Sequence, residues 1–231
     1  MTLIACSAKT SGTTHTVFKT ASIVMLIAFA IQLVPGFVGT TVISSVQLST
    51  DASPMHLTAR FDVGLAALFL VALYCKRTTS LTELRALAVP TVIVAVVTTT
   101  AVMSVAWLAG YIRFDVKWPP FALLHLGKTL LVTAVVEEAI FRGVLQEQLA
   151  RLPYFSSGRF RTALPVIFSA TLFGLAHLPG GWLLAAMATL AGLGYALAYA
   201  FTKRIEAPIA VHFLVNATHF VAFTYPHLAV T

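Results

Sequence analysis

The chain has 231 residues, of which 58% are hydrophobic and only 10% are charged, and its mean hydropathy is +0.90. This composition excludes an ordinary water-soluble domain and indicates a membrane protein. The net charge of +7 does not indicate nucleic-acid binding, because the basic residues are spread over connecting segments and do not cluster with aromatic residues. We therefore expect the lipid bilayer as a partner, and no nucleic acid.

Apolar runs follow one another along almost the whole chain. A helix crosses the hydrocarbon with about 20 residues, because it satisfies its own backbone hydrogen bonds. The seven predicted membrane helices are 17–39, 61–75, 86–110, 121–149, 163–178, 182–202 and 207–224. The second and the fifth are short, so tilt or partial burial is expected for them. The predicted fold class is all-α, a polytopic transmembrane helix bundle.

No polar stretch is long enough to form a separate soluble domain. We expect a cytoplasmic N-terminal segment at 1–16 and a single integral membrane domain at 17–231. No cleavable signal pattern precedes the first apolar run. Cys6 and Cys75 lie near predicted membrane ends without metal-ligand spacing, and we interpret them as unpaired thiols.

The basic residues are distributed unevenly over the connecting segments. With the N-terminus in the cytoplasm, ten lysines and arginines fall on the cytoplasmic side and three on the opposite side. The ten are Lys9, Lys19, Lys76, Arg77, Arg85, Arg151, Arg159, Arg161, Lys203 and Arg204, and the three are Arg60, Arg113 and Lys117. This bias follows the positive-inside rule. It predicts a multi-pass protein of a bacterial cytoplasmic (inner) membrane with a cytoplasmic N-terminus.

The fourth run holds the remaining cations, Lys128 and Arg142, and the adjacent glutamates Glu137 and Glu138. Each ionisable side chain at membrane depth costs roughly 2.5–3.5 kcal/mol, so such groups normally face the bundle interior or a wet cavity. Glu138 and Arg142 share a helix face and are predicted to form an ion pair, whereas Glu137 points about 100° away. A carboxylate without a cation, beside a like charge, should hold its proton more readily, as general acid–base chemistry requires. A purely structural salt bridge is the alternative interpretation.

Two later runs carry histidines at helical spacing. FGLAH places Phe173 and His177 one turn apart, and HFLVN does the same for His212 and Asn216, with His219 on the same face. Two carboxylates, two imidazoles and an amide on separate helices predict a buried site that binds and activates water.

These residues resemble the signature of the CPBP intramembrane proteases, also called the Abi family. That family includes CAAX prenyl endopeptidases and bacterial relatives linked to bacteriocin processing or immunity. Its motifs are EExxxR, FxxxH and HxxxN, in this order on successive membrane helices. This sequence reads EEAIFR at 137–142, FGLAH at 173–177 and HFLVN at 212–216. The resemblance covers about 121–224, which is the expected catalytic core.

The resemblance implies an intramembrane endopeptidase of the glutamic type. It would hydrolyse a peptide bond of a membrane-anchored or hydrophobic peptide or protein substrate with a glutamate-activated water. Glu137 is then the general base, Glu138 supports it, and Arg142 fixes the charge.

The histidine motifs receive the remaining roles by the same resemblance. His177 would help to hold the water, while His212 and Asn216 would bind the scissile carbonyl and stabilise the oxyanion. Phe173 is a candidate substrate-binding residue.

Zinc is the alternative to this metal-free chemistry, since two histidines and a glutamate satisfy zinc-ligand requirements. We expect no metal and no cofactor, because the sequence contains no HExxH helix and no cysteine accompanies the site. Asn216 also suits an oxyanion better than it suits zinc.

Two features depart from the family pattern. Its members commonly have eight membrane helices, so an eighth helix is left open here. In addition, His177 lies late in the fifth run and His212 early in the seventh. This order predicts a separation of roughly 10–15 Å in depth unless helices tilt or the fifth run fails to span.

Two other classes of function fit the composition. A non-proteolytic membrane scaffold or bacteriocin-immunity protein would have the same apolar membrane helices. A transporter would bury similar charges but usually shows an internal repeat, which this sequence lacks. For a protease, the substrate would be a peptide leader or a C-terminal sorting tail, with the cleaved sequence, the side of cleavage and the oligomeric state left open.

Overall fold

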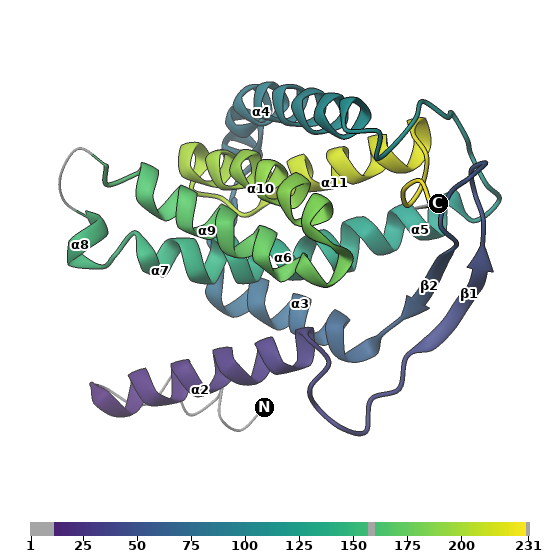
Figure 1. The fold of residues 1–231 in the computed structure, drawn as a ribbon. Coiled ribbons are helices and arrows are strands. Elements are labelled where there is room, and N and C mark those ends of the chain that lie inside the picture. Colours follow the sequence, from purple (N-terminus) through teal and green to yellow (C-terminus); the bar gives the residue numbers. More distant parts are fainter. Residues whose placement is uncertain (1–11, 157–159, 230–231) are drawn as a thin grey trace.

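A computed structural model describes residues 12–156 and 160–229. The chain forms a helical bundle with one two-stranded sheet (Figure 1). The N-terminal elements are α2 (Thr13–Ala30), β1 (Thr40–Val46), β2 (Met55–Ala59), α3 (Phe61–Tyr74) and α4 (Leu81–Leu108). The fourth helix comprises α5 (Ala122–Lys128), η1 (Thr129–Ala134), α6 (Val135–Glu138), η2 (Ala139–Gln146) and α7 (Glu147–Leu149). The remaining elements are α8 (Pro153–Ser156), α9 (Ala163–Ala176), η3 (Leu178–Gly180), α10 (Trp182–Thr202) and α11 (Glu206–Ala222).

Each predicted run coincides with a helix, but the first prediction is wrong at its C-terminal end. The run 17–39 is helical only to Ala30. Gln32 adopts a left-handed φ of 64°, and the amides of Gln32 and Leu33 donate to the carbonyls of Phe29 and Ala28. This is a Schellman C-cap, which ends a helix even where the side chains stay apolar. Cys6, Lys9 and Arg159 lie outside the described residues, as does most of the segment 1–16.

The β-hairpin was not predicted, because the segment near 40–60 is rich in Ser and Thr and lies between two predicted membrane helices. Thr40 pairs with Ala59 and Val46 with Met55 in an antiparallel register. Threonine, valine and isoleucine favour extended backbone, and their density in β1 is the signal for a strand. The all-α prediction therefore holds for the bundle but not for this hairpin.

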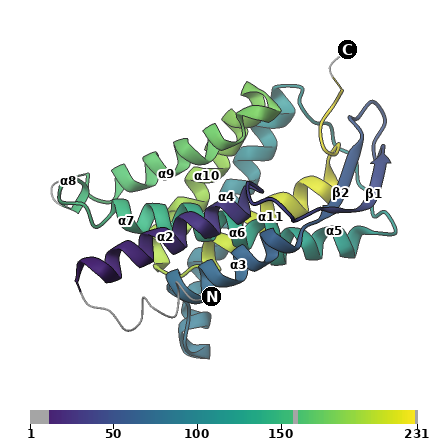
Figure 2. The same ribbon diagram turned by 90° about the horizontal axis from the view of Figure 1, so that it is seen from below.

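The connecting segments gather at two ends of the molecule (Figures 1 and 2). At one end, Ala52 beyond β1 forms a β-bridge with Leu228, and Phe114 forms one with Phe223. The Ser49 hydroxyl there donates to Asp115 and holds the pKa of that carboxyl below its ordinary value. This end contains the segments that the topology places opposite the cytoplasm.

The other end contains segments predicted to be cytoplasmic. Lys76 Nζ lies 2.7 Å from Glu147 Oε1, and the Ile205 amide donates to the Lys76 carbonyl. Arg204 Nη2 lies 3.2 Å from Glu83 Oε1. The chain thus sorts its connections as the positive-inside rule requires, while the orientation in the membrane stays a prediction.

Two helices of the described chain, α4 and α10, are long and apolar enough to cross a membrane. On α4, Val89, Val92, Ile93, Val96 and Val97 are each at least 57% exposed. Such an apolar stripe would be an aggregation hazard in water but suits lipid. The number of membrane spans stays a prediction.

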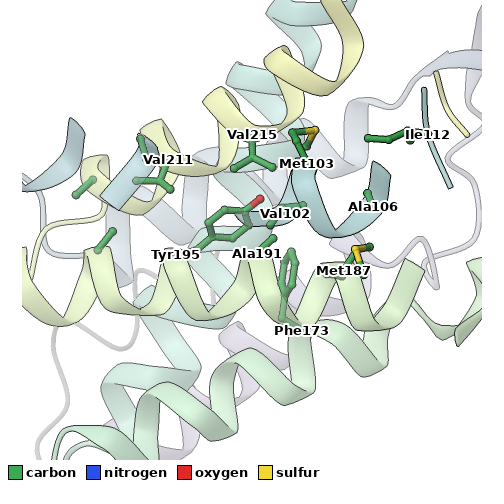
Figure 3. Close-up of a cluster of buried hydrophobic side chains, with 14 residues drawn as sticks. Val102, Met103, Ala106, Ile112, Phe173, Met187, Ala191, Tyr195, Val211 and Val215 are labelled. Atoms are coloured by element: carbon green, nitrogen blue, oxygen red, sulfur yellow. The ribbon is translucent and has the colours of Figure 1, made fainter. Parts of the chain in front are cut away.

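The helices α4, α9, α10 and α11 enclose the main core (Figure 3). Small residues let α9 and α10 approach closely, as in many membrane bundles. A Cβ added at Gly174 of α9 would lie 2.7 Å from the carbonyl oxygen of Ala185 on α10. Phe173 and Tyr195 project into this core from α9 and α10 and form the floor of the site described next.

Candidate active site

The predicted ion pair within the fourth helix is confirmed. Arg142 Nε lies 3.1 Å from Glu138 Oε2, and both side chains are fully buried. Arg142 Nη2 also donates to the carbonyl of Gly192 at 2.9 Å. The guanidinium carbon lies 4.8 Å from the centre of the Phe173 ring, which is cation–π distance. Glu138 is therefore paired with a buried arginine that is itself held by other contacts.

Glu138 also holds His212 of α11. The atoms His212 Nδ1 and Glu138 Oε1 are 2.8 Å apart. A carboxylate that faces an arginine is a hydrogen-bond acceptor, so Nδ1 is the donor. The Tyr195 ring stacks on the imidazole with centroids 4.5 Å apart and an interplanar angle of 10°. These two contacts fix the ring plane and direct Nε2 of His212 toward Glu137.

Glu137 lies between the two histidines. Its Oε2 is 3.9 Å from His212 Nε2 and 4.0 Å from His177 Nε2. The Nδ1 atom of His177 donates to the Phe173 carbonyl at 2.8 Å, which fixes that ring as well. These gaps are too long for direct hydrogen bonds but admit a water oxygen at about 2.8 Å from each partner.

The expected separation in depth between the two histidines is wrong. Both imidazoles reach the same oxygen of Glu137. The reason is that α9 ends at Ala176 after 14 residues, and η3 turns the chain back into α10. The fifth run therefore delivers His177 to the middle of the bundle, which is the exception that the sequence left open.

A cavity of about 220 Å³ opens beside these groups. Glu137, His177, His212, Asn216 and His219 line it together with apolar side chains. Glu137 and His177 are 28% and 29% exposed in their side chains, so water reaches them, whereas Glu138 is sealed off. The structure thus brings the predicted carboxylates, imidazoles and amide to one place.

A second cavity of about 1030 Å³ adjoins the first. It runs between the fourth helix, α2, α3 and the hairpin, and it shares Thr133, Glu137 and His177 with the smaller cavity. Glu137 therefore stands at the junction of a small inner chamber and a large groove.

Residues 118–218 match the family model described as type II CAAX prenyl endopeptidase Rce1-like. The match covers 101 of the 231 residues, and this segment is similar to that family. The match agrees with the resemblance drawn from the three motifs. Comparisons with curated proteins and with solved structures give no match.

Phe173 and Tyr195 pack against the histidine rings of the site. Phe173 is only 2% exposed, and its ring centre lies 4.7 Å from that of His177 and 5.8 Å from that of His212. Its observed contacts are those of a positioning residue, and contact with a substrate stays a prediction. Tyr195 was missed by the sequence interpretation, since it belongs to none of the three motifs. The only signal was the pair of tyrosine hydroxyls, of Tyr195 and Tyr199, in the apolar run GLGYALAYA.

The fit of a metal ion to this site can be judged from its donor atoms. In residues 12–156 and 160–229, no three His, Cys, Asp or Glu side chains are grouped closely enough to hold one. The hydrogen bond from Glu138 would orient His212 for a metal as well as for water. The metal-free mechanism therefore stays a prediction, to be tested by chelation.

Proposed function

We propose that the protein is an intramembrane endopeptidase that hydrolyses a peptide bond of a membrane-anchored or hydrophobic substrate with water activated by Glu137. One observation carries the proposal: Glu137 Oε2 lies within 4.0 Å of Nε2 of both His177 and His212, at the junction of two cavities. This spacing suits one water molecule held between a carboxylate and two imidazoles.

In the first step, Glu137 takes a proton from the water while the water oxygen attacks the scissile carbonyl carbon. The carbonyl oxygen becomes an oxyanion facing His212 and Asn216 on α11. Positive charge on the His212 imidazole is stabilised by the Glu138 carboxylate at 2.8 Å. A well-placed donor to an oxyanion contributes about 2.7–4 kcal/mol to catalysis.

In the second step, the tetrahedral intermediate collapses and the carbon–nitrogen bond breaks. The proton on Glu137 passes to the departing amine, which regenerates the carboxylate. Arg142 takes no part in either proton transfer. Its role is to pair with Glu138 inside the bundle, so that His212 keeps its orientation.

The test is cleavage by the purified protein in lipid nanodiscs. The substrates are a prenylated peptide, an apolar C-terminal tail and a membrane-anchored leader peptide, and the products are identified by mass spectrometry. Glu137→Gln keeps the shape of the side chain but removes the base, so turnover should fall by roughly 100-fold or more. Glu83→Gln, at the start of α4 and away from the site, is the matched control and should keep activity.

Two outcomes would overturn the proposal. Cleavage by Glu137→Gln at the wild-type rate would remove Glu137 as the base. Absence of any cleavage by the wild type would favour the scaffold or immunity alternative.

A further inference from the structure

A third cavity, of about 300 Å³, lies at the end of the bundle that the topology places in the cytoplasm. The first turns of α2, the last turn of α3 and the C-terminal end of the fourth helix enclose it, and these segments lie at the same end of the molecule in Figure 1. It shares no lining residue with the two cavities that contain Glu137. This cavity is therefore separate from the candidate active site.

The lining of this cavity changes from charged to apolar along α2. His15, Lys19 and Ile23 follow one another at intervals of four residues, so they lie on one helix face, and all three line the cavity. Ile23 lies about 6 Å further along the helix axis than Lys19, since a helix rises about 1.5 Å per residue. Arg151 adds a second cation to the lining, and Leu73 adds a second apolar side chain. Such a lining suits a ligand that is charged at one end and apolar at the other.

The acidic side chain in this lining, Glu147, is already engaged by cations. Its Oε1 lies 2.7 Å from Lys76 Nζ and 3.0 Å from Arg151 Nη2, and its Oε2 accepts a hydrogen bond from the Tyr199 hydroxyl at 3.1 Å. Two cations share this one carboxylate, so the cluster keeps a net positive charge. Lys19 adds a further charge, because none of the ion pairs in the described part of the chain includes it. The cavity therefore attracts anions.

Contacts between helices hold the walls of this cavity in place. The hydroxyls of Ser22 on α2 and Tyr74 on α3 form a hydrogen bond, and Tyr74 itself lines the cavity. Further along α2, Leu26 belongs to the same buried apolar cluster as Ala139 of the fourth helix. The cavity is therefore a fixed feature of the fold.

We propose that this cavity binds the phosphate group of an anionic phospholipid from the cytoplasmic leaflet. The surface of that leaflet is negatively charged, and basic pockets between membrane helices on its side bind lipid headgroups. Lys19 and Arg151 hold the phosphate by charge-assisted hydrogen bonds. The acyl chains lie along α2, where Val17 and Val24 are exposed. Because α2 also contributes Ile27 to the large cavity, the bound lipid fastens one wall of that cavity.

Native mass spectrometry of the whole protein in detergent tests this proposal. The probes are dioleoylphosphatidylglycerol, which is anionic, and dioleoylphosphatidylcholine, which has no net charge, each titrated into delipidated protein. We expect the first molecule of the anionic lipid to bind roughly tenfold more tightly than the neutral one. Lys19→Gln should weaken binding of the anionic lipid about fivefold, which is the contribution of one cation beside anionic lipid, and should leave the neutral lipid unaffected.

Further variants refine this test. Lys19→Arg keeps the charge and should keep the preference for the anionic lipid. Arg85→Gln removes an exposed charge near the start of α4, at the same end of the molecule but outside the lining of the cavity, and should bind as the wild type does. Glu137→Gln should also bind the anionic lipid normally, since the cavity shares no lining residue with the candidate active site. The lipid site is thereby tested independently of cleavage.

Equal binding of the two lipids by the wild type would overturn the proposal. Equal losses in Lys19→Gln and Arg85→Gln would overturn it as well, since they would show only a general attraction of anionic lipid to this end of the protein. Inorganic phosphate in large excess should not displace the anionic lipid, because the acyl chains add apolar contacts that a free anion lacks. Displacement by inorganic phosphate would indicate a site for free phosphate and would refute the lipid site.

Discussion

Two glutamate–arginine pairs, one within the fourth helix and one at its C-terminal end, share their spacing but not their surroundings. Glu138 and Arg142 are 3.1 Å apart with both side chains fully buried. Glu147 and Arg151 are 3.0 Å apart, and the Arg151 side chain is 56% exposed. Water screens the second pair but not the first. The two pairs therefore contribute differently to the stability of the folded protein.

The first prediction compares the loss of each arginine. Arg142→Ala strands a buried carboxylate and should lower the free energy of unfolding by about 3–5 kcal/mol. Arg151→Ala should change it by less than about 1 kcal/mol. Thermal denaturation in detergent checks both variants, and equal shifts in Tm would show that Glu138 does not depend on Arg142.

The second prediction concerns Asn216 and the metal question. Its amide is a good donor to an oxyanion and a poor zinc ligand, so Asn216→Ala should lower kcat far more than it raises KM. Activity should survive prolonged chelation, and elemental analysis should find no stoichiometric metal. Loss of activity on chelation with recovery on added zinc would instead make His177 and His212 ligands.

At this scale, the sequence predicts contacts within a helix better than contacts between helices. The Glu138–Arg142 pair follows from a spacing of four residues. The contact between Glu138 and His212 joins residues 74 positions apart and depends on how α11 packs. Tyr195 could not be placed in the site, because only the packing of α10 shows that its ring covers His212.

Among the elements, the π-helical turns of η1 and η2 and the hairpin were not predicted, although the Thr, Val and Ile residues of β1 favour a strand. Both are stabilised by contacts that arise only in the assembled bundle. The hairpin is backed by the C-terminal segment, where the Ser53 amide donates to the His227 carbonyl. In the fourth helix, the apolar pattern fixes the length of the helix but not the number of residues in each turn.

The third prediction tests the close contact of α9 and α10. Gly174→Ala forces a methyl group against the Ala185 carbonyl and should cost about 1–3 kcal/mol of stability. Gly64→Ala on α3 is the matched control, since a Cβ there meets nothing within 4 Å. The control should be neutral or slightly stabilising, because alanine favours helix. Thermal unfolding in detergent measures both, and a Gly174→Ala protein as stable as wild type would contradict the tight packing.

For the whole molecule, the sorting of connections to two ends constrains the topology. The segments 76–85 and 203–206 are tied together by the Arg204–Glu83 and Lys76–Ile205 contacts. They must therefore lie on the same side of the membrane.

The fourth prediction follows from that arrangement and from the positive-inside rule. Reporter fusions after Lys9, within 76–85, within 151–161 and within 203–206 should all report the cytoplasm. A fusion at Thr231 should report the opposite side. A cytoplasmic report at Thr231 would mean that the number of spans is wrong by an odd number.

The placement of the Glu138–Arg142 pair within one helix has a consequence for biosynthesis. The ribosome adds roughly 5–20 residues per second, so the 74 positions between Glu138 and His212 correspond to about 4–15 s of translation. During that interval the fourth helix must enter the membrane without its later partners. Because both members of the ion pair leave the ribosome almost together, the helix neutralises these two charges by itself. The nascent chain can thus insert its most polar helix before the helix that completes the site has been made.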